Sequence, residues 1–271
     1  MSHDIILEEH VEDLGDIGYV EAPWDEALQL LQKQDYAAPI SARDLAFACV
    51  QTGNLNSLFK QGSYIKESIL YSPNQNHLLI SASSILDNAK KATQAHRNKK
   101  EYSPLQNTIE RFWCEAREDC GKYPQKRRVL TLGYRQTYDI PTTRFDEDEL
   151  TLFLFKDQAR LYGSFLDEHG IKKMFFHLED VPHASQNSFE RPLWLHHLSG
   201  RSLLSGCGVL DFGVRVRGVR RGATITDEEY LQNSSELSLR NTHKALDALN
   251  PPKTRAGLLP ILIHQIGRKY Q

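Results

Sequence analysis

The stretch "RPLWLHHLSGRSLLSGCGVLDFGVRVRGVRRG", residues 191–222, is the most distinctive part of this 271-residue chain. Glycine, serine, leucine and histidine follow one another in it without a helical or strand period, until it ends in the alternating "VRVRGVRR". In a strand, this alternation places Arg215 and Arg217 on one face, with Arg220 and Arg221 just beyond. Periodicity alone therefore predicts only that the stretch ends in a basic strand.

The arginines of this strand have two physical interpretations. A row of guanidinium groups can neutralise phosphates, or it can form buried ion pairs that fasten the strand to an acidic region of the same chain. Residues 1–50 contain eleven acidic and two basic side chains, and the remainder carries an excess of seven basic ones. This asymmetry indicates either intramolecular complementarity or a basic functional face.

The composition is that of a globular protein, with 40% hydrophobic and 25% charged residues in one large domain or two modest ones. The longest apolar runs, such as residues 150–155, are too short to cross a bilayer. The N-terminus has neither a basic start nor an apolar core, so no signal peptide is predicted. The four cysteines lack CxxC spacing and are expected to be reduced thiols: Cys49, Cys114, Cys120 and Cys207.

Helical spacing and short apolar runs bounded by turn residues alternate along the chain. Helices are predicted at 24–34, 41–50, 84–100 and 104–119, strands within 62–83 around an "SPNQN" turn and at 128–134, two helices and a strand over 142–180, and further helices over 226–253 and 257–266. The second helix begins after Ser41, a residue suited to an N-cap. Mixed elements of this kind predict an α+β fold.

The most specific enzyme motifs are absent from the sequence: it contains no GxGxxG, GxxxxGK[ST], HExxH or GxSxG. Candidate metal ligands are His177, Asp180, His183, His196, His197 and Cys207. Adjacent histidines in a strand point to opposite faces, which argues against a shared zinc ion. Cys207 with a histidine base would be a possible nucleophile. We predict no catalytic residue, no metal and no cofactor, and keep a histidine-based metalloenzyme as a third alternative.

Five residue types are missing from a long part of the focal stretch. From Leu195 to Asp227, thirty-three consecutive residues include no Lys, Glu, Gln, Trp or Met, and no codon ending in a pyrimidine encodes any of these five. Asn is also absent there, against eleven elsewhere in the chain. Rewriting the first two positions of AAC or AAT codons would produce this restricted alphabet. The chain thereby resembles the variable proteins of diversity-generating retroelements of archaea, bacteria and phages, in which template adenines are misread, and "LW" and "RVRGVRR" resemble the fixed residues that bracket their variable regions.

The resemblance implies a C-type-lectin-like fold with short antiparallel strands and peripheral helices over residues 1–227. Its variable region would lie at about 191–222, with 228–271 as a helical extension packed on the domain. It also implies a non-enzymatic protein that binds a macromolecular ligand, most readily a protein. Calcium-dependent lectins use several carboxylates, whereas this segment offers only Asp211, so no calcium site is predicted. The alternative is a nucleic-acid-binding or processing protein that uses the basic strand.

Diversity must occupy surface positions, because repacking a core costs more than about 1 kcal/mol. The predicted ligand-facing residues are His196, His197, Ser199, Gly200, Ser202, Ser205, Cys207, Gly208, Leu210, Asp211, Phe212 and Gly213. The predicted scaffold residues are Trp194, Arg215, Val216, Arg217, Gly218 and Val219.

Overall fold

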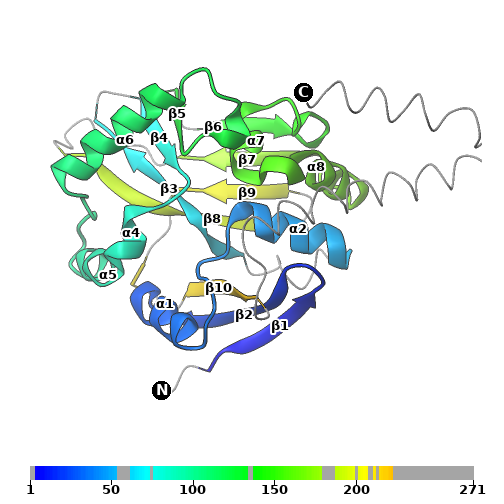
Figure 1. Cartoon of the computed structure of the whole chain (residues 1–271), viewed down its shortest axis with the longest axis horizontal. Coiled ribbons are helices and arrows are strands. Elements are labelled where there is room, and N and C mark those ends of the chain that lie inside the picture. Colours follow the sequence, from blue (N-terminus) through cyan, green and yellow to red (C-terminus); the bar gives the residue numbers. More distant parts are fainter. Residues whose placement is uncertain are drawn as a thin grey trace, which may run out of the picture. The chain divides into compact units, whose positions relative to one another are not determined.

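The computed structural model describes residues 4–53, 62–73, 76–133, 137–178, 187–198, 201–206, 210–211 and 214–221. They belong to one compact unit, Met1–Arg221 (Figure 1). The predicted extension at 228–271 and its helices lie outside the described residues. Its packing on the domain therefore stays a prediction.

Within the described residues, ten strands form one sheet in the order β1-β2-β10-β3-β8-β9-β7-β6, with β4 and β5 as a branch from β3 (Figure 1). The strands are β1 (Ile6–Val11), β2 (Gly15–Ala22), β3 (Ser63–Tyr71), β4 (His77–Ile80), β5 (Val129–Leu132), β6 (Thr137–Pro141), β7 (Lys173–His177), β8 (Phe189–Leu198), β9 (Arg201–Ser205) and β10 (Val214–Arg220). Most neighbouring strands are antiparallel, but β10 pairs with β3, and β7 with β9, in parallel.

Strand β3 is the point at which the sheet divides. Its start pairs with β10, where Tyr64 lies opposite Val216. Its end pairs with β4 over Ser68–Leu70, and its other edge pairs with β8 along most of its length. Strands β10 and β4 therefore share one edge of β3. Tyr64 of β3 lies between Val216 of β10 on one side and Trp194 of β8 on the other.

The helices are α1 (Trp24–Lys33), α2 (Ala42–Thr52), α4 (Ser84–Asp87), α5 (Ala89–Arg97), α6 (Gln106–Asp119), α7 (Glu149–Phe155) and α8 (Ala159–Glu168), with short 3-10 turns at Pro124–Lys126, Thr142–Arg144 and Lys156–Gln158. The predicted helices at 24–34, 41–50 and 104–119 are confirmed, as are the two helices before β7. The helix predicted at 84–100 is divided, because Asn88 leaves the helical conformation with φ −128°.

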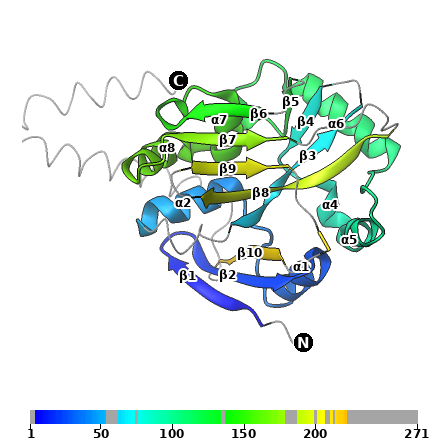
Figure 2. The ribbon, with the colours of Figure 1, turned by 180° about the vertical axis from the view of Figure 1, so that it is seen from behind.

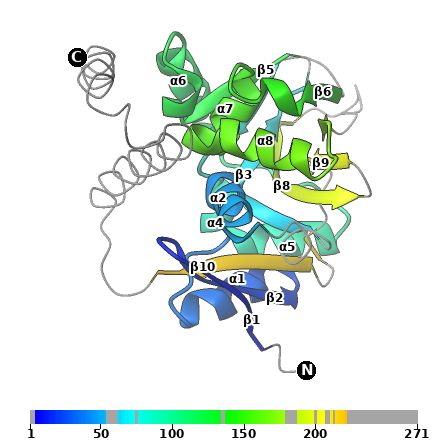
Figure 3. The same ribbon diagram turned by 90° about the vertical axis from the view of Figure 1, so that its right-hand side faces the viewer.

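Three apolar clusters of described residues hold these layers together. Helices α2, α7 and α8 pack on one side of the sheet, in a core that includes Phe153, Leu195 and Leu204. Helices α1 and α5 pack with β2 and β10 around Trp24 and Tyr64, and α6 packs against β4 and β5. Figure 3 shows α2, α7 and α8 on one side of strands β8 and β9.

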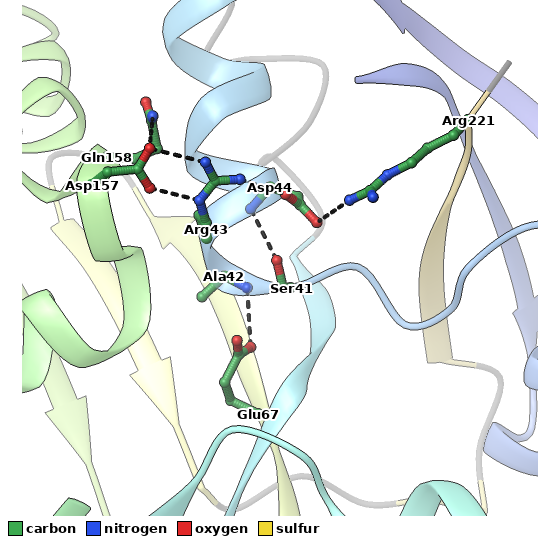
Figure 4. Close-up of polar contacts among 8 residues, drawn as sticks. All are labelled: Ser41, Ala42, Arg43, Asp44, Glu67, Asp157, Gln158 and Arg221. Atoms are coloured by element: carbon green, nitrogen blue, oxygen red, sulfur yellow. Dashed lines mark hydrogen bonds and ion pairs between the residues drawn. The ribbon is translucent and has the colours of Figure 1, made fainter. Parts of the chain in front are cut away.

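Helix α2 begins as its sequence predicts. The hydroxyl of Ser41 accepts a hydrogen bond from the backbone N–H of Asp44 at 3.1 Å, which is an N-cap. A second backbone N–H of the first turn, that of Ala42, donates to Oε2 of the buried Glu67 on β3 at 3.0 Å (Figure 4). The start of α2 is therefore joined to the centre of the sheet by a carboxyl group.

Candidate ligand-binding site

The first half of the focal stretch forms a hairpin of β8 and β9. Trp194 lies opposite Ser205, His196 opposite Leu203, and His197 opposite Ser202. Strand β9 also pairs in parallel with β7, which places Leu203 beside Phe175. The hairpin is therefore built into the sheet, and four of the predicted ligand-facing residues lie on two of its central strands: His196, His197, Ser202 and Ser205.

The two sides of the hairpin differ in burial. Leu195, Ser202 and Leu204 are fully buried on the side covered by α2, α7 and α8. His196, Leu203 and Ser205 alternate with them and are partly exposed, as expected for side chains on opposite faces of strands. The ligand-facing prediction for Ser202 is wrong, because this strand position points into the core beside Tyr162 of α8.

Leu210 was also predicted to face the ligand, and this prediction is wrong. Its side chain is fully buried in the cluster that contains Trp24, Tyr64 and Val216. Its carbonyl accepts a hydrogen bond from the backbone N–H of Trp24 at 3.1 Å. The next residue, Asp211, is partly exposed. Leu210 therefore fixes the connection between β9 and β10 to the start of α1.

Asp211 lies near the partly buried His96 of α5. Burial lowers the pKa of His96, and the charge of Asp211 opposes that shift. The predicted residues Ser199, Gly200, Cys207, Gly208, Phe212 and Gly213 lie outside the described residues, and so does the side chain of His197; for these the ligand-facing role stays a prediction.

The partly exposed side of the hairpin continues across β7 to β6. On β7, Met174 and Phe176 are fully buried in the core, whereas Lys173, Phe175 and His177 alternate with them and are partly or fully exposed. Nζ of Lys173 contacts Oδ2 of Asp139 on β6 at 2.8 Å. Figure 2 shows strands β8, β9, β7 and β6 side by side. We call this side of the four strands the outer face.

Polar contacts hold the stem of β8 in place before the outer face begins. The buried carboxylate of Glu190 accepts hydrogen bonds from the hydroxyls of Ser68 at 2.5 Å and Ser83 at 2.8 Å, and from both the backbone N–H and the hydroxyl of Ser84. Burial raises the pKa of Glu190, and these donors oppose the shift. The stem of β8 is therefore fixed to β3 and to the start of α4.

A row of rings leads from the core to the outer face. Tyr64 packs edge-on against Trp24 with centroids 5.1 Å apart, and against Trp194 with centroids 4.8 Å apart. The ring of His196 lies 6.5 Å from that of Trp194. Burial lowers the pKa of His196. Trp194 thus joins the fixed core to the first residues of the hairpin.

The predicted scaffold residues of β10 lie inside the fold. Val216, Arg217, Gly218 and Val219 are buried. Val216 belongs to the core around Trp24, and Val219 to the core on the opposite side. Strand β10 therefore contributes to both cores.

The arginines of the basic strand pair with acidic residues of the N-terminal region. Arg217 is fully buried and contacts both carboxylate oxygens of Glu8, with Nε at 2.6 Å and Nη2 at 2.8 Å. Arg215 contacts Glu21, and Arg220 contacts Asp16 at 2.8 Å.

Arg221 lies 3.8 Å from Asp44 at the start of α2 (Figure 4). The three arginines of β10 and the adjoining Arg221 therefore all have acidic neighbours within residues 1–50. The intramolecular interpretation of the charge asymmetry is confirmed. The phosphate-binding alternative requires a row of guanidinium groups that are not paired with acidic side chains, whereas Arg215, Arg217 and Arg220 of β10 are so paired.

The remaining sequence expectations concern metals, thiols and membranes. In the part of the chain that the structure describes, no three His, Cys, Asp or Glu side chains are grouped so that they could hold a metal ion. Asp180, His183 and Cys207 lie outside that part. Cys49, Cys114 and Cys120 are free thiols, as predicted. No helix among the described residues is both long and apolar enough to span a membrane.

No protein-family model and no curated protein matches the chain. Its structure is similar to a solved structure from Nanoarchaeota, presented as the accommodation of massive sequence variation by the C-type lectin fold, with a TM-score of 0.51 over 75% of this chain and 96% of the other. The chain has a C-type lectin fold. Sequence identity between the two is 16%, so the similarity concerns the fold.

Within this C-type lectin fold, several residues that position the outer face were not predicted from the sequence. Glu8 carried only the general signal of an acid-rich N-terminus. Glu190 and Tyr64 carried none, because their partners are remote in sequence. Gly62 precedes a predicted strand, but its contacts with Trp194 and Arg217 depend on pairing between strands far apart in the chain.

Proposed function

We propose that this C-type lectin fold is a non-enzymatic ligand-binding domain whose recognition surface is diversified by a retroelement. One observation carries the proposal. The run of residues that lacks five residue types begins at Leu195, and in the β8–β9 hairpin it supplies His196, Leu203 and Ser205 to the outer face. Restricted composition and a partly exposed sheet position thus coincide.

The hairpin separates positions that can vary from positions that cannot. Truncating a buried leucine such as Leu195 or Leu204 costs about 2–5 kcal/mol, whereas surface substitutions usually change stability by less than about 0.5 kcal/mol. The proposed ligand-facing set in the described residues is therefore His196, Leu203, Ser205 and Asp211. The predicted positions whose side chains the structure does not describe complete the proposed surface: His197, Ser199, Gly200, Cys207, Gly208, Phe212 and Gly213.

The chemistry of the outer face favours a protein as the ligand. Its centre carries Phe175, Leu203 and His196, and the Lys173–Asp139 ion pair lies toward the β6 edge. Aromatic and aliphatic groups at the centre of a patch, with polar groups at the rim, are typical of protein interfaces. Such a surface supplies contact area and hydrogen bonds, and the proposal assigns no catalytic step to it.

The test of diversification is the sequence of many gene copies from one population. We expect substitutions at adenine positions between codons 191 and 222, matched by an intact template repeat nearby. Codons for Trp194 and for the buried residues of β10 should be constant. Substitutions spread evenly along the gene would overturn the proposal.

A further inference from the structure

Gly62 lies where the fixed strands meet the outer face. It has a left-handed backbone conformation, with φ +68°, and directly precedes β3. In the register of β3 and β8, Ser63 lies opposite Leu195 and Tyr64 opposite Trp194. Extending this register by one residue brings Gly62 level with His196.

Two residues of β8 approach Gly62 so closely that no side chain fits there. A β-carbon added to Gly62 would lie 2.5 Å from Cζ2 of Trp194 and 2.7 Å from Cβ of His196. Neither neighbour is a flexible chain end, because the indole packs against Tyr64 and the β-carbon belongs to the strand. Trp194 and His196 therefore rest directly on the backbone of Gly62.

The carbonyl of Gly62 is held by a further contact. Nη1 of Arg217 donates a hydrogen bond to it at 2.5 Å. Arg217 is itself fixed, because it is fully buried and its other nitrogens contact both oxygens of Glu8. Contacts thus run without interruption from β1 through β10 and Gly62 to the start of the hairpin.

We propose that Gly62 is a positioning residue of the ligand-binding face, which sets where Trp194 and the β-carbon of position 196 lie. The role of the face in binding rests on the proposed function, whereas the positioning itself does not. A fixed β-carbon at position 196 has a consequence for diversification: every residue introduced there would project onto the outer face from the same point, without moving the strand.

The chain offers a matched control for Gly62. Gly53, at the end of α2, has nearly the same left-handed conformation, φ +62°, but an added β-carbon there would meet nothing within 4 Å. Gly62→Ala and Gly53→Ala therefore incur similar backbone strain. Only the first introduces a β-carbon against Trp194 and His196.

The experiment compares the two variants in the full chain by NMR, using the indole N–H signals of the three tryptophans and the imidazole signals of His196. We expect Gly62→Ala to shift the Trp194 and His196 signals and to leave those of Trp113, on α6, in place. Gly53→Ala should leave all of them unchanged. Equal spectra for the two variants would overturn the proposal, and so would shifts spread over all three tryptophans in Gly62→Ala.

A second comparison covers the case in which Gly62→Ala does not fold. Trp194→Phe removes the indole atoms that lie closest to the new β-carbon and leaves its contact with the β-carbon of position 196. The double variant should therefore fold, with a urea midpoint below that of Trp194→Phe alone. A double variant that also fails to fold would overturn the proposal. Neither readout requires a ligand, so a negative result in the gene-sequence survey would remove the proposed function and leave the positioning role standing.

Discussion

Arg217 on β10 and Glu8 on β1 are 209 positions apart in sequence and form a two-contact ion pair, with N–O distances of 2.6 and 2.8 Å. Glu8 lies at an irregularity of the β1–β2 pairing, between Leu7 and Glu9. Strand β1 is the last strand of the sheet, and an irregularity with an inward-pointing charge hinders pairing of such an edge with another chain. The pair thus fastens β10 and also protects the edge.

Removing the charge of Glu8 should destabilise the fold strongly. Glu8→Gln keeps the shape but leaves the buried guanidinium of Arg217 without its counter-charge, and breaking a buried pair costs about 3–5 kcal/mol. Urea denaturation measures the loss. Asp16→Asn, which breaks the exposed pair with Arg220, is the control and should change the midpoint little. Equal losses in the two variants would contradict the energetic role assigned to the buried pair.

Glu67 should make the stability depend on pH. Burial raises its pKa from 4.5 to about 7, while the hydrogen bond from Ala42 and the charges of Lys156 and Lys66 oppose the shift. Between these values the folded chain retains a proton that the unfolded chain has lost, so Glu67 lowers stability as pH rises through this window and contributes no further change above pH 7.

Glu67→Gln should therefore be more stable than the wild type above pH 7, by an amount on the order of 3 kcal/mol. The difference between the two proteins should vanish near pH 4, because the carboxyl is then protonated in both states. Urea titrations from pH 4 to 8 measure it, with Glu168→Gln on the exposed surface as control. A constant difference across this range would contradict the raised pKa.

Local signals in the sequence predicted much of the fold. Ser41 specified the start of α2, and the "SPNQN" turn specified the pairing of β3 with β4, because caps and turns depend on neighbouring residues. Strands β1, β2 and β6 were not predicted. Their partners, such as β10 for β2, are distant in sequence. The parallel pairings of β3 with β10 and of β7 with β9 have no local sequence signal at all.

The candidate site was predicted only as a region. Ser202 was placed on the wrong side, because the inward and outward positions of a strand follow from its register and not from residue type. Leu210, on the connection between β9 and β10, was misplaced because its burial depends on Trp24 and Tyr64, which are distant in sequence. In this stretch, residue types carry less information than usual, since serine occupies both a core position, Ser202, and an outer one, Ser205. The charge asymmetry indicated that the arginines of β10 could pair with acidic side chains of the N-terminal region. Only the arrangement of the strands identified Glu8 as the partner of Arg217.

Substitutions of two adjacent leucines of β9 should differ in their effect on stability, because one leucine lies on the outer face and the other in the core. Leu204→Ala removes a fully buried side chain from the core and should cost about 2–5 kcal/mol. Leu203→Ala, on the partly exposed side, should cost less than about 1 kcal/mol. The two substitutions are chemically identical, so each is the control for the other in urea denaturation. Similar losses at both positions would contradict the assignment of the outer face.

The basic strand should bind DNA weakly and without a steep dependence on salt. Each arginine that replaces counterions on duplex DNA contributes about −0.9 to the slope of log K against log salt concentration, but Arg215, Arg217 and Arg220 already contact Glu21, Glu8 and Asp16. Fluorescence anisotropy with a labelled duplex at several salt concentrations measures this slope. Arg220→Ala leaves Arg215 and Arg217 in place and should alter neither the affinity nor the slope. A steep slope in the wild type that becomes shallower by about one unit in Arg220→Ala would show that the acidic partners release the strand to phosphate, and would favour the nucleic-acid alternative over a protein ligand.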